Sequence, residues 1–338
     1  MQHLAGLGWT GHETEHWQQD GEALPGRVAI MHGPAAEVIW YPGGEERHEL
    51  FHLTSDLPVS PVAGDWVTIT DGALTGVLPR RASLTRPDPN GKDVQVMASN
   101  MDLILIALPI DRGLNRKAAE RLSVMAWDSG AQPVIVLTKA DGAADAEAEA
   151  AAAAEVAPGV DVIVTSSLSG EGVARLRELM ADRTSVLLGA SGAGKTSLLN
   201  ALEGREEAVR EVRRDGEGRH TTTTRKLYRL SSGGVLLDIP GIRALDLLAS
   251  EDGLEETFAD IAELAAGCQF ADCAHEGDKG CAVEAAIASG ELPARRLESW
   301  RTIRREMAYQ NRRNDPEAMA AQRQKWKAMS KESRTNKR

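Results

Sequence analysis

The sequence predicts a multidomain protein in which a small antiparallel β-barrel precedes an α/β domain, and a helical region ends the chain. Three observations predict this arrangement. The chain has 338 residues, short β-rich runs give way to apolar strands alternating with helical segments, and all three cysteines fall within 14 residues. A chain of this length exceeds the roughly 100 to 200 residues of one ordinary domain.

The composition is that of a globular protein, with 42% hydrophobic and 26% charged residues. No apolar run approaches the roughly 20 residues that span a bilayer, and no basic stretch followed by an apolar one opens the chain. We therefore expect a cytoplasmic protein with reduced thiols and no membrane partner. The net charge of −11 is uneven, because residues 294–338 hold 14 Lys/Arg against 5 Asp/Glu.

The barrel is predicted over residues 27–85, after an N-terminal extension (1–26) that has no interpretable motif. Four β-rich runs, RVAIMH, AEVIWY, HELFHL and DWVTIT, are separated by turn-forming segments. A five-stranded barrel of the oligonucleotide-binding (OB) type is favoured, although periodicity alone does not separate it from other small β folds. The following segment, PRRASLTRPDPNGKD, is interpreted as a linker.

The α/β domain is predicted over residues 95–247. Its strands are nearly continuous apolar runs, which indicates a mostly parallel sheet covered on both faces. The helix predicted from the run ADAEAEAAAAAEVA, 144–157, consists of good helix formers and is expected to be solvent-exposed. The expected strands are LILIAL (103–108), PVIVL (133–137), VDVIV (160–164), SVLL (185–188), KLYRL (226–230) and VLLD (235–238).

The segment GASGAGKT matches G-x-x-x-x-G-K-[ST] at every fixed position, between a predicted strand and a predicted helix. In such a loop, backbone N–H groups approach phosphate oxygens, the lysine reaches the β and γ phosphates, and the Thr hydroxyl binds Mg²⁺. The predicted phosphate-binding residues are Gly189, Ala190, Ser191, Gly192, Ala193, Gly194, Lys195, Thr196 and Ser197.

Two further segments indicate which base is bound. TKAD (138–141) resembles the N-K-x-D motif of GTPases, in which Asp141 would accept hydrogen bonds from guanine and Lys139 would pack over the ring. Thr138 stands where that motif usually has Asn, which shortens an amide contact to a hydroxyl. TSSLSGEG (165–172) resembles the S-A-K-type loop, with Ser166 and Ser167 beside guanine, although a helix cap would explain it equally well.

The segment DIPG (238–241) ends a predicted strand as D-x-x-G does in GTPases, where Asp238 would contact Mg²⁺ through water and Gly241 would sense the γ-phosphate. All these motifs follow strands, at the edge where open α/β sheets bind ligands. Their order is unusual, because TKAD and TSSLSGEG precede the phosphate loop. The sequence therefore predicts a circularly permuted P-loop α/β GTPase domain.

The cysteines form C-x4-C-x-H-x5-C together with His275. Three Cys and one His suit tetrahedral Zn²⁺ and leave no open position for catalysis, so the predicted ion is structural. The alternative is a group of buried thiols with a surface histidine. The predicted zinc ligands are Cys268, Cys273, His275 and Cys281, within a helical zinc-binding domain over residues 248–338.

The permuted order, the run GEGRHTTTT (216–224) and the cysteine window together resemble the ribosome small-subunit-dependent GTPase A family. The resemblance covers about residues 27–330. It implies an OB-type barrel, a permuted GTPase domain and a small zinc domain. It also implies GTP hydrolysis to GDP and phosphate, stimulated by the small (30S) ribosomal subunit and acting in late subunit maturation.

Three residues are candidates for the hydrolytic step: Lys195 in the phosphate loop, Thr223 and His220. Thr223, with Thr222 as the second choice, lies where the first switch belongs and would complete a Mg²⁺ site with Thr196 and Asp238. His220 could orient water, although an ordinary loop histidine explains it equally well. Because Ile242 replaces the water-orienting Gln of Ras-like enzymes, slow intrinsic turnover is predicted.

The tail combines Lys/Arg with aromatic residues, which suits ribosomal RNA (rRNA), although a solvated helix also fits. The expected partners are GTP or GDP, the small subunit and its rRNA, and we expect a monomer. Two other functions stay open: a P-loop kinase or ATPase, and a zinc-stabilised RNA-binding protein with a degenerate nucleotide site.

Overall fold

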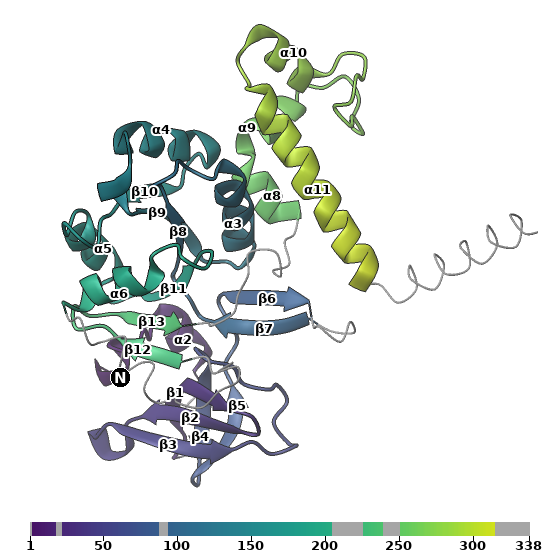
Figure 1. Ribbon diagram of the computed structural model, residues 1–338. Coiled ribbons are helices and arrows are strands. Elements are labelled where there is room, and N and C mark those ends of the chain that lie inside the picture. Colours follow the sequence, from purple (N-terminus) through teal and green to yellow (C-terminus); the bar gives the residue numbers. More distant parts are fainter. Residues whose placement is uncertain (1, 18–21, 88–93, 205–225, 239–250, 315–338) are drawn as a thin grey trace, which may run out of the picture.

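The computed structural model describes residues 2–17, 22–87, 94–204, 226–238 and 251–314. An antiparallel barrel, a central α/β domain and a group of C-terminal helices follow one another along the chain (Figure 1). No described helix is long and apolar enough to cross a membrane.

Five antiparallel strands form the N-terminal barrel in the order β3-β2-β1-β4-β5. Their inward side chains, among them Val38, Phe51 and Val67, make one buried apolar cluster. Within the described residues no ladder joins β3 to β5, so the barrel is open there. The OB type stays a prediction. The strands are β1 (Leu24–His32), β2 (Ala35–Trp40), β3 (Arg47–His52), β4 (Trp66–Thr70) and β5 (Ala73–Val77), with a 3-10 turn over Pro42–Gly44.

The segment expected to be a linker contains a strand, so that prediction was wrong. β6 (Ser83–Pro87) pairs antiparallel with β7 (Val94–Ser99). Leu84, Met97 and Ala98 are buried in the main core, which stabilises a hairpin despite the turn-forming residues between its strands. The segment was predicted as a linker because Pro and Gly are uncommon within strands, and these residues outweighed the alternating pattern of the strand itself.

The α/β domain has the strand order β10-β9-β8-β11-β13-β12. All neighbours are parallel except β12 and β13, as expected for a mostly parallel sheet. The phosphate-loop strand β11 lies in the middle, between β8 and β13. The strands are β8 (Leu103–Pro109), β9 (Gln132–Thr138), β10 (Asp161–Val164), β11 (Thr184–Leu188), β12 (Lys226–Arg229) and β13 (Val235–Asp238).

Helices cover both faces of this sheet. Ile104 and Ile106 of β8 pack with α3 and α4, whereas Leu103 and Leu105 of the same strand pack with α5 and α6. This alternation is what two buried faces require. The helices are α3 (Arg116–Asp128), α4 (Ala146–Val156), α5 (Val173–Met180) and α6 (Lys195–Glu203), and a 3-10 turn covers Ala140–Gly142.

Helix α4 is less exposed than its sequence suggested. Its helical state agrees with the prediction, but Ala152, Ala153 and Val156 are buried. Alanines form this buried face, so the hydrophobic periodicity was too weak to reveal it.

The remaining helices lie at the two ends of the chain. Near the N-terminus, Leu4 and Leu7 are buried in the main core. At the other end, Phe258 and Leu297 build a separate core that also includes Val124 of α3. The helices are α1 (Gln2–Ala5), α2 (Gly11–His16), α8 (Glu251–Thr257), α9 (Ala259–Ala265), α10 (Ala282–Ser289) and α11 (Ala294–Asn314).

Candidate nucleotide and metal sites

The predicted nucleotide motifs lie at the carboxyl edge of the parallel strands. The phosphate loop follows β11, TKAD begins at the last residue of β9, TSSLSGEG follows β10, and Asp238 ends β13. Because these strands are parallel, their carboxyl ends meet at one edge of the sheet. His220, Thr223 and Gly241 lie outside the described residues.

The phosphate loop ends at the first residue of α6, Lys195. A side chain at Gly189 would place its Cβ 2.5 Å from the carbonyl oxygen of Ala107, so only glycine fits there. Lys195 Nζ donates to the carbonyl oxygens of Gly189, at 2.7 Å, and Ala190, at 2.8 Å. Burial lowers the pKa of Lys195, although nearby Asp238 acts in the opposite direction.

Thr138 connects the base motif to the phosphate loop. Its side chain is buried, and its hydroxyl donates to the carbonyl oxygen of Ala193 at 2.7 Å. Thr138 therefore holds two binding loops together. Lys139 adopts a left-handed conformation, with φ of 59°, and its Nζ lies 3.2 Å from Asp111 Oδ2.

Asp141 and Ser166 join the TKAD and TSSLSGEG loops. The buried Ser166 hydroxyl donates to Asp141 Oδ1 at 2.5 Å, and the Ala140 N–H donates to the Thr165 carbonyl at 3.1 Å. Ser166 Oγ also accepts hydrogen bonds from two backbone N–H groups of its own loop. Ser166 thus orients the carboxylate that would bind guanine, while Ser167, beside it, is half-buried.

The phosphate loop leaves several residues open to a ligand. Ala190, Ser191, Gly192, Thr196 and Ser197 are exposed, whereas Ala193 is buried. Thr196, the predicted Mg²⁺ residue, occupies the second position of α6. Backbone N–H groups at a helix N-terminus and an ammonium group favour an anion here.

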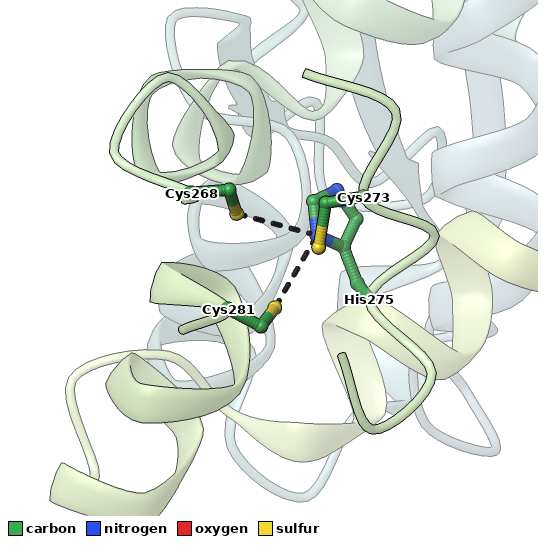
Figure 2. A group of neighbouring side chains, drawn as sticks. All are labelled: Cys268, Cys273, His275 and Cys281. Carbon is green, nitrogen blue, oxygen red and sulfur yellow. Dashed lines mark hydrogen bonds between the residues drawn. The ribbon is translucent and has the colours of Figure 1, made fainter. Parts of the chain in front are cut away.

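The four predicted zinc ligands converge, and their ligand atoms all lie within 4.8 Å of one another. Figure 2 shows His275 Nδ1 between two thiols, 3.6 Å from Cys268 Sγ and 3.4 Å from Cys281 Sγ. Sulfur and nitrogen atoms about 2.3 and 2.0 Å from a common tetrahedral centre would be about 3.5 Å apart. The donor set therefore fits one tetrahedral metal ion.

The surroundings of this cluster suit a metal ion. Burial lowers the pKa of His275, which favours the neutral, ligating imidazole. Burial acts to raise the pKa of Cys268, but hydrogen bonds from the backbone N–H groups of Ala282 and Val283 bring it below its ordinary value. Burial raises the pKa of Cys273 to about 12, so a metal ion that binds there displaces a proton.

Some structurally important residues near these sites were missed from the sequence. Asp111 lies two residues after the end of β8, and its position after an apolar strand was an available indication. The buried Arg296 and its partner Glu120 gave no indication, because single charged residues in helical segments are normally exposed.

The strand order, the motif order and the Cys3His cluster define a circularly permuted P-loop GTPase with a separate metal site. The RsgA GTPase family model matches residues 77–248. The chain belongs to this family. Two curated relatives, both called "Small ribosomal subunit biogenesis GTPase RsgA", are 40% identical (Streptomyces avermitilis) and 42% identical (Streptomyces coelicolor). The alignments cover 98% and 90% of this chain, and 93% and 86% of the relatives.

Two solved structures share the fold. YjeQ from Thermotoga maritima has a TM-score of 0.64 and 24% identity, over 85% of this chain and 99% of its own. YloQ, described as a circularly permuted GTPase, has a TM-score of 0.60 and 22% identity, over 86% of this chain and 97% of its own.

Proposed function

We propose that the protein hydrolyses GTP to GDP and phosphate and acts, through the small ribosomal subunit, in that subunit's biogenesis. The observation that carries the proposal is the junction of base motif and phosphate loop. The Thr138 hydroxyl bonds the Ala193 carbonyl, and Ser166 orients the Asp141 carboxylate. The names of the curated relatives support the same activity and the same cellular process.

Each residue has a distinct task in this proposal. The carboxylate of Asp141 accepts hydrogen bonds from guanine, a donor pair that adenine lacks. Lys195 reaches the β and γ phosphates, and Mg²⁺, held by Thr196, Thr223 and Asp238, supplies compensating positive charge. His220 orients the attacking water. The small subunit and its rRNA order the switch segments and so raise a slow basal rate.

The Cys3His cluster holds one structural Zn²⁺ in this proposal. Zn²⁺ is favoured because three thiolates and one imidazole are its usual tetrahedral donors. The chain around the cluster, 266–281, contains no helix or strand in the structure, so the ion would supply the cross-links that secondary structure does not.

The decisive experiment measures GTP turnover with and without purified small ribosomal subunits, in wild type and in Asp141→Asn. Stimulated turnover of GTP over ATP is expected. Asp141→Asn should weaken GTP binding about tenfold to a hundredfold, because hydrogen bonds to a charged acceptor are lost. Asp161→Asn, at the opposite end of β10, is the matched control. Turnover of ATP, or of neither nucleotide, would contradict the proposal.

A further inference from the structure

The barrel and the α/β domain share one continuous sheet through β12. On one side β12 pairs with β13, and on the other with β1 of the barrel. Figure 1 shows β12 and β13 between the barrel and the rest of the α/β domain. Strand β12 would otherwise be the edge of the α/β sheet, so the barrel closes that edge.

One row of paired residues crosses this boundary. Ile30 of β1 lies opposite Lys226 of β12, and Lys226 lies opposite Asp238 of β13. Directly opposite residues in antiparallel strands are held about 4.5 to 5.5 Å apart. Asp238 ends its strand and is the aspartate of the proposed Mg²⁺ site. Asp238 is therefore connected to the barrel across two strand pairings, while β11 holds β13 from its other side.

A polar side-chain cluster fastens the other end of β12 to the barrel. The Arg229 guanidinium donates to Glu46 Oε2 at 2.7 Å and also to the Tyr41 hydroxyl. The Tyr41 hydroxyl donates to the same Glu46 oxygen at 2.7 Å. Tyr41 follows β2 and Glu46 precedes β3, so the cluster joins β12 to the connection between two barrel strands.

The cluster is charged at neutral pH. Burial acts to raise the pKa of Glu46, but hydrogen bonds from Tyr41 and His48 and the Arg229 charge bring it below its ordinary value. Among the described residues a single registered pair joins β1 to β12, so these side chains are a large part of what holds β12 against the barrel.

We propose that Arg229, Tyr41 and Glu46 are positioning residues for the Mg²⁺ site of the GTPase. They anchor β12 on the barrel, and the row from Ile30 to Asp238 transmits that position to the metal-binding aspartate. The inference rests on the proposed function, and it makes the barrel a part of the nucleotide site.

The test compares GDP affinity with and without Mg²⁺ in the wild-type protein, Arg229→Ala and the milder Tyr41→Phe. We expect the Mg²⁺-dependent gain in affinity to fall about twofold to fivefold in Arg229→Ala, the scale of a partly exposed ion pair. Affinity without Mg²⁺ should not change. Tyr41→Phe should show a smaller effect of the same sign. Hydrogen exchange should rise in residues 226–238.

Arg116→Ala is the matched control, because it breaks a similarly exposed ion pair, Arg116–Glu155, on the α3 and α4 side. It should behave as wild type. If Arg229→Ala and Tyr41→Phe keep the full Mg²⁺ gain, the cluster only joins two domains and the inference is overturned. If the wild-type protein binds no guanine nucleotide, the proposed function fails, and this inference fails with it.

Discussion

Replacement of Arg296 should weaken the attachment of the C-terminal helices to the α/β domain. Its side chain is 1% exposed and lies 3.1 Å from the buried Glu120 of α3 and 2.7 Å from Asp260 of α9. It also donates to the carbonyl oxygens of Val156 and Thr257, and its guanidinium lies 4.3 Å from the Phe258 ring centroid. One side chain thus connects α3 and α4 with α8 and α9.

The expected cost follows from the burial of both charges. Removing Arg296 leaves the buried Glu120 with the longer contact to Arg295, and a buried charge that loses its partner costs about 3 to 5 kcal/mol. Arg296→Ala should therefore lower the free energy of unfolding by about that amount, measured by urea denaturation with far-ultraviolet circular dichroism. Hydrogen exchange should rise first in α8 and α9, which lose the ion pair and the hydrogen bonds that Arg296 makes with them.

The adjacent Arg295 provides a matched control. It contacts the same Glu120, at 3.4 Å, and Glu155, at 3.0 Å, but it is 32% exposed. A partly exposed pair contributes at most about 1 kcal/mol, so Arg295→Ala should be nearly neutral. If the two variants lose the same free energy of unfolding within about 1 kcal/mol, the burial of Arg296 does not increase what its ion pairs contribute to stability.

Two other predictions concern the metal cluster and the N-terminal segment. Cys281→Ser should abolish binding of the single expected Zn²⁺, measured by metal analysis, and should unfold the segment around it; retention of one tightly bound ion would contradict the Cys3His assignment. Glu13 is buried, which acts to raise its pKa, but hydrogen bonds from Thr10 outweigh burial and lower the pKa. The ionised carboxylate therefore stabilises the fold above about pH 4.5, and this contribution is lost as the pH falls through the pKa that Glu13 has in the folded protein. Glu13→Gln should therefore cost most at neutral pH, about 1 kcal/mol, the scale of one hydrogen bond. The difference from wild type should shrink in acid, and a difference independent of pH would contradict this.

The sequence predicted most of the α/β domain because its strands are almost purely apolar. The strand LILIAL, predicted at 103–108, is β8 at Leu103–Pro109, and VLLD coincides with β13. Buried parallel strands combine a continuous apolar run with fixed turn residues, and both features are local in sequence. The metal cluster was predictable for the same reason, because its ligands lie within 14 residues.

Contacts between distant segments were not predictable in this way. Arg27 is fully buried, stacks on Trp66, and bonds the carbonyl oxygens of Leu7 and Asn100, which joins the N-terminal segment, the barrel and the α/β domain. Burial lowers the pKa of Arg27 to about 10. No local pattern marks such an arginine. By contrast, Thr10 and Glu13 have the three-residue spacing of a capping box, and this local pattern could have predicted the start of α2.

Thr138 stands where the N-K-x-D motif usually has Asn, and the structure shows which contact its hydroxyl makes. From sequence, a hydroxyl in place of an amide suggested a weaker contact to guanine. In the structure the hydroxyl is directed to the phosphate loop and away from solvent, with 3% of the residue exposed. Thr138 therefore bears on how the two loops are held together, and in the proposed function base selection depends on Asp141.

The C-terminal helices and the barrel contact the α/β domain at different elements. Between β13 and α8 the chain passes through residues 239–250, but the described contacts of those helices are to α3 and α4. Helix α4 begins at Ala146, just beyond the TKAD motif that ends at Asp141. The contact with the C-terminal helices, however, is at Val156, the other end of α4, whereas the barrel joins the α/β domain through β12. The barrel and the C-terminal helices are therefore attached to different elements of the α/β domain.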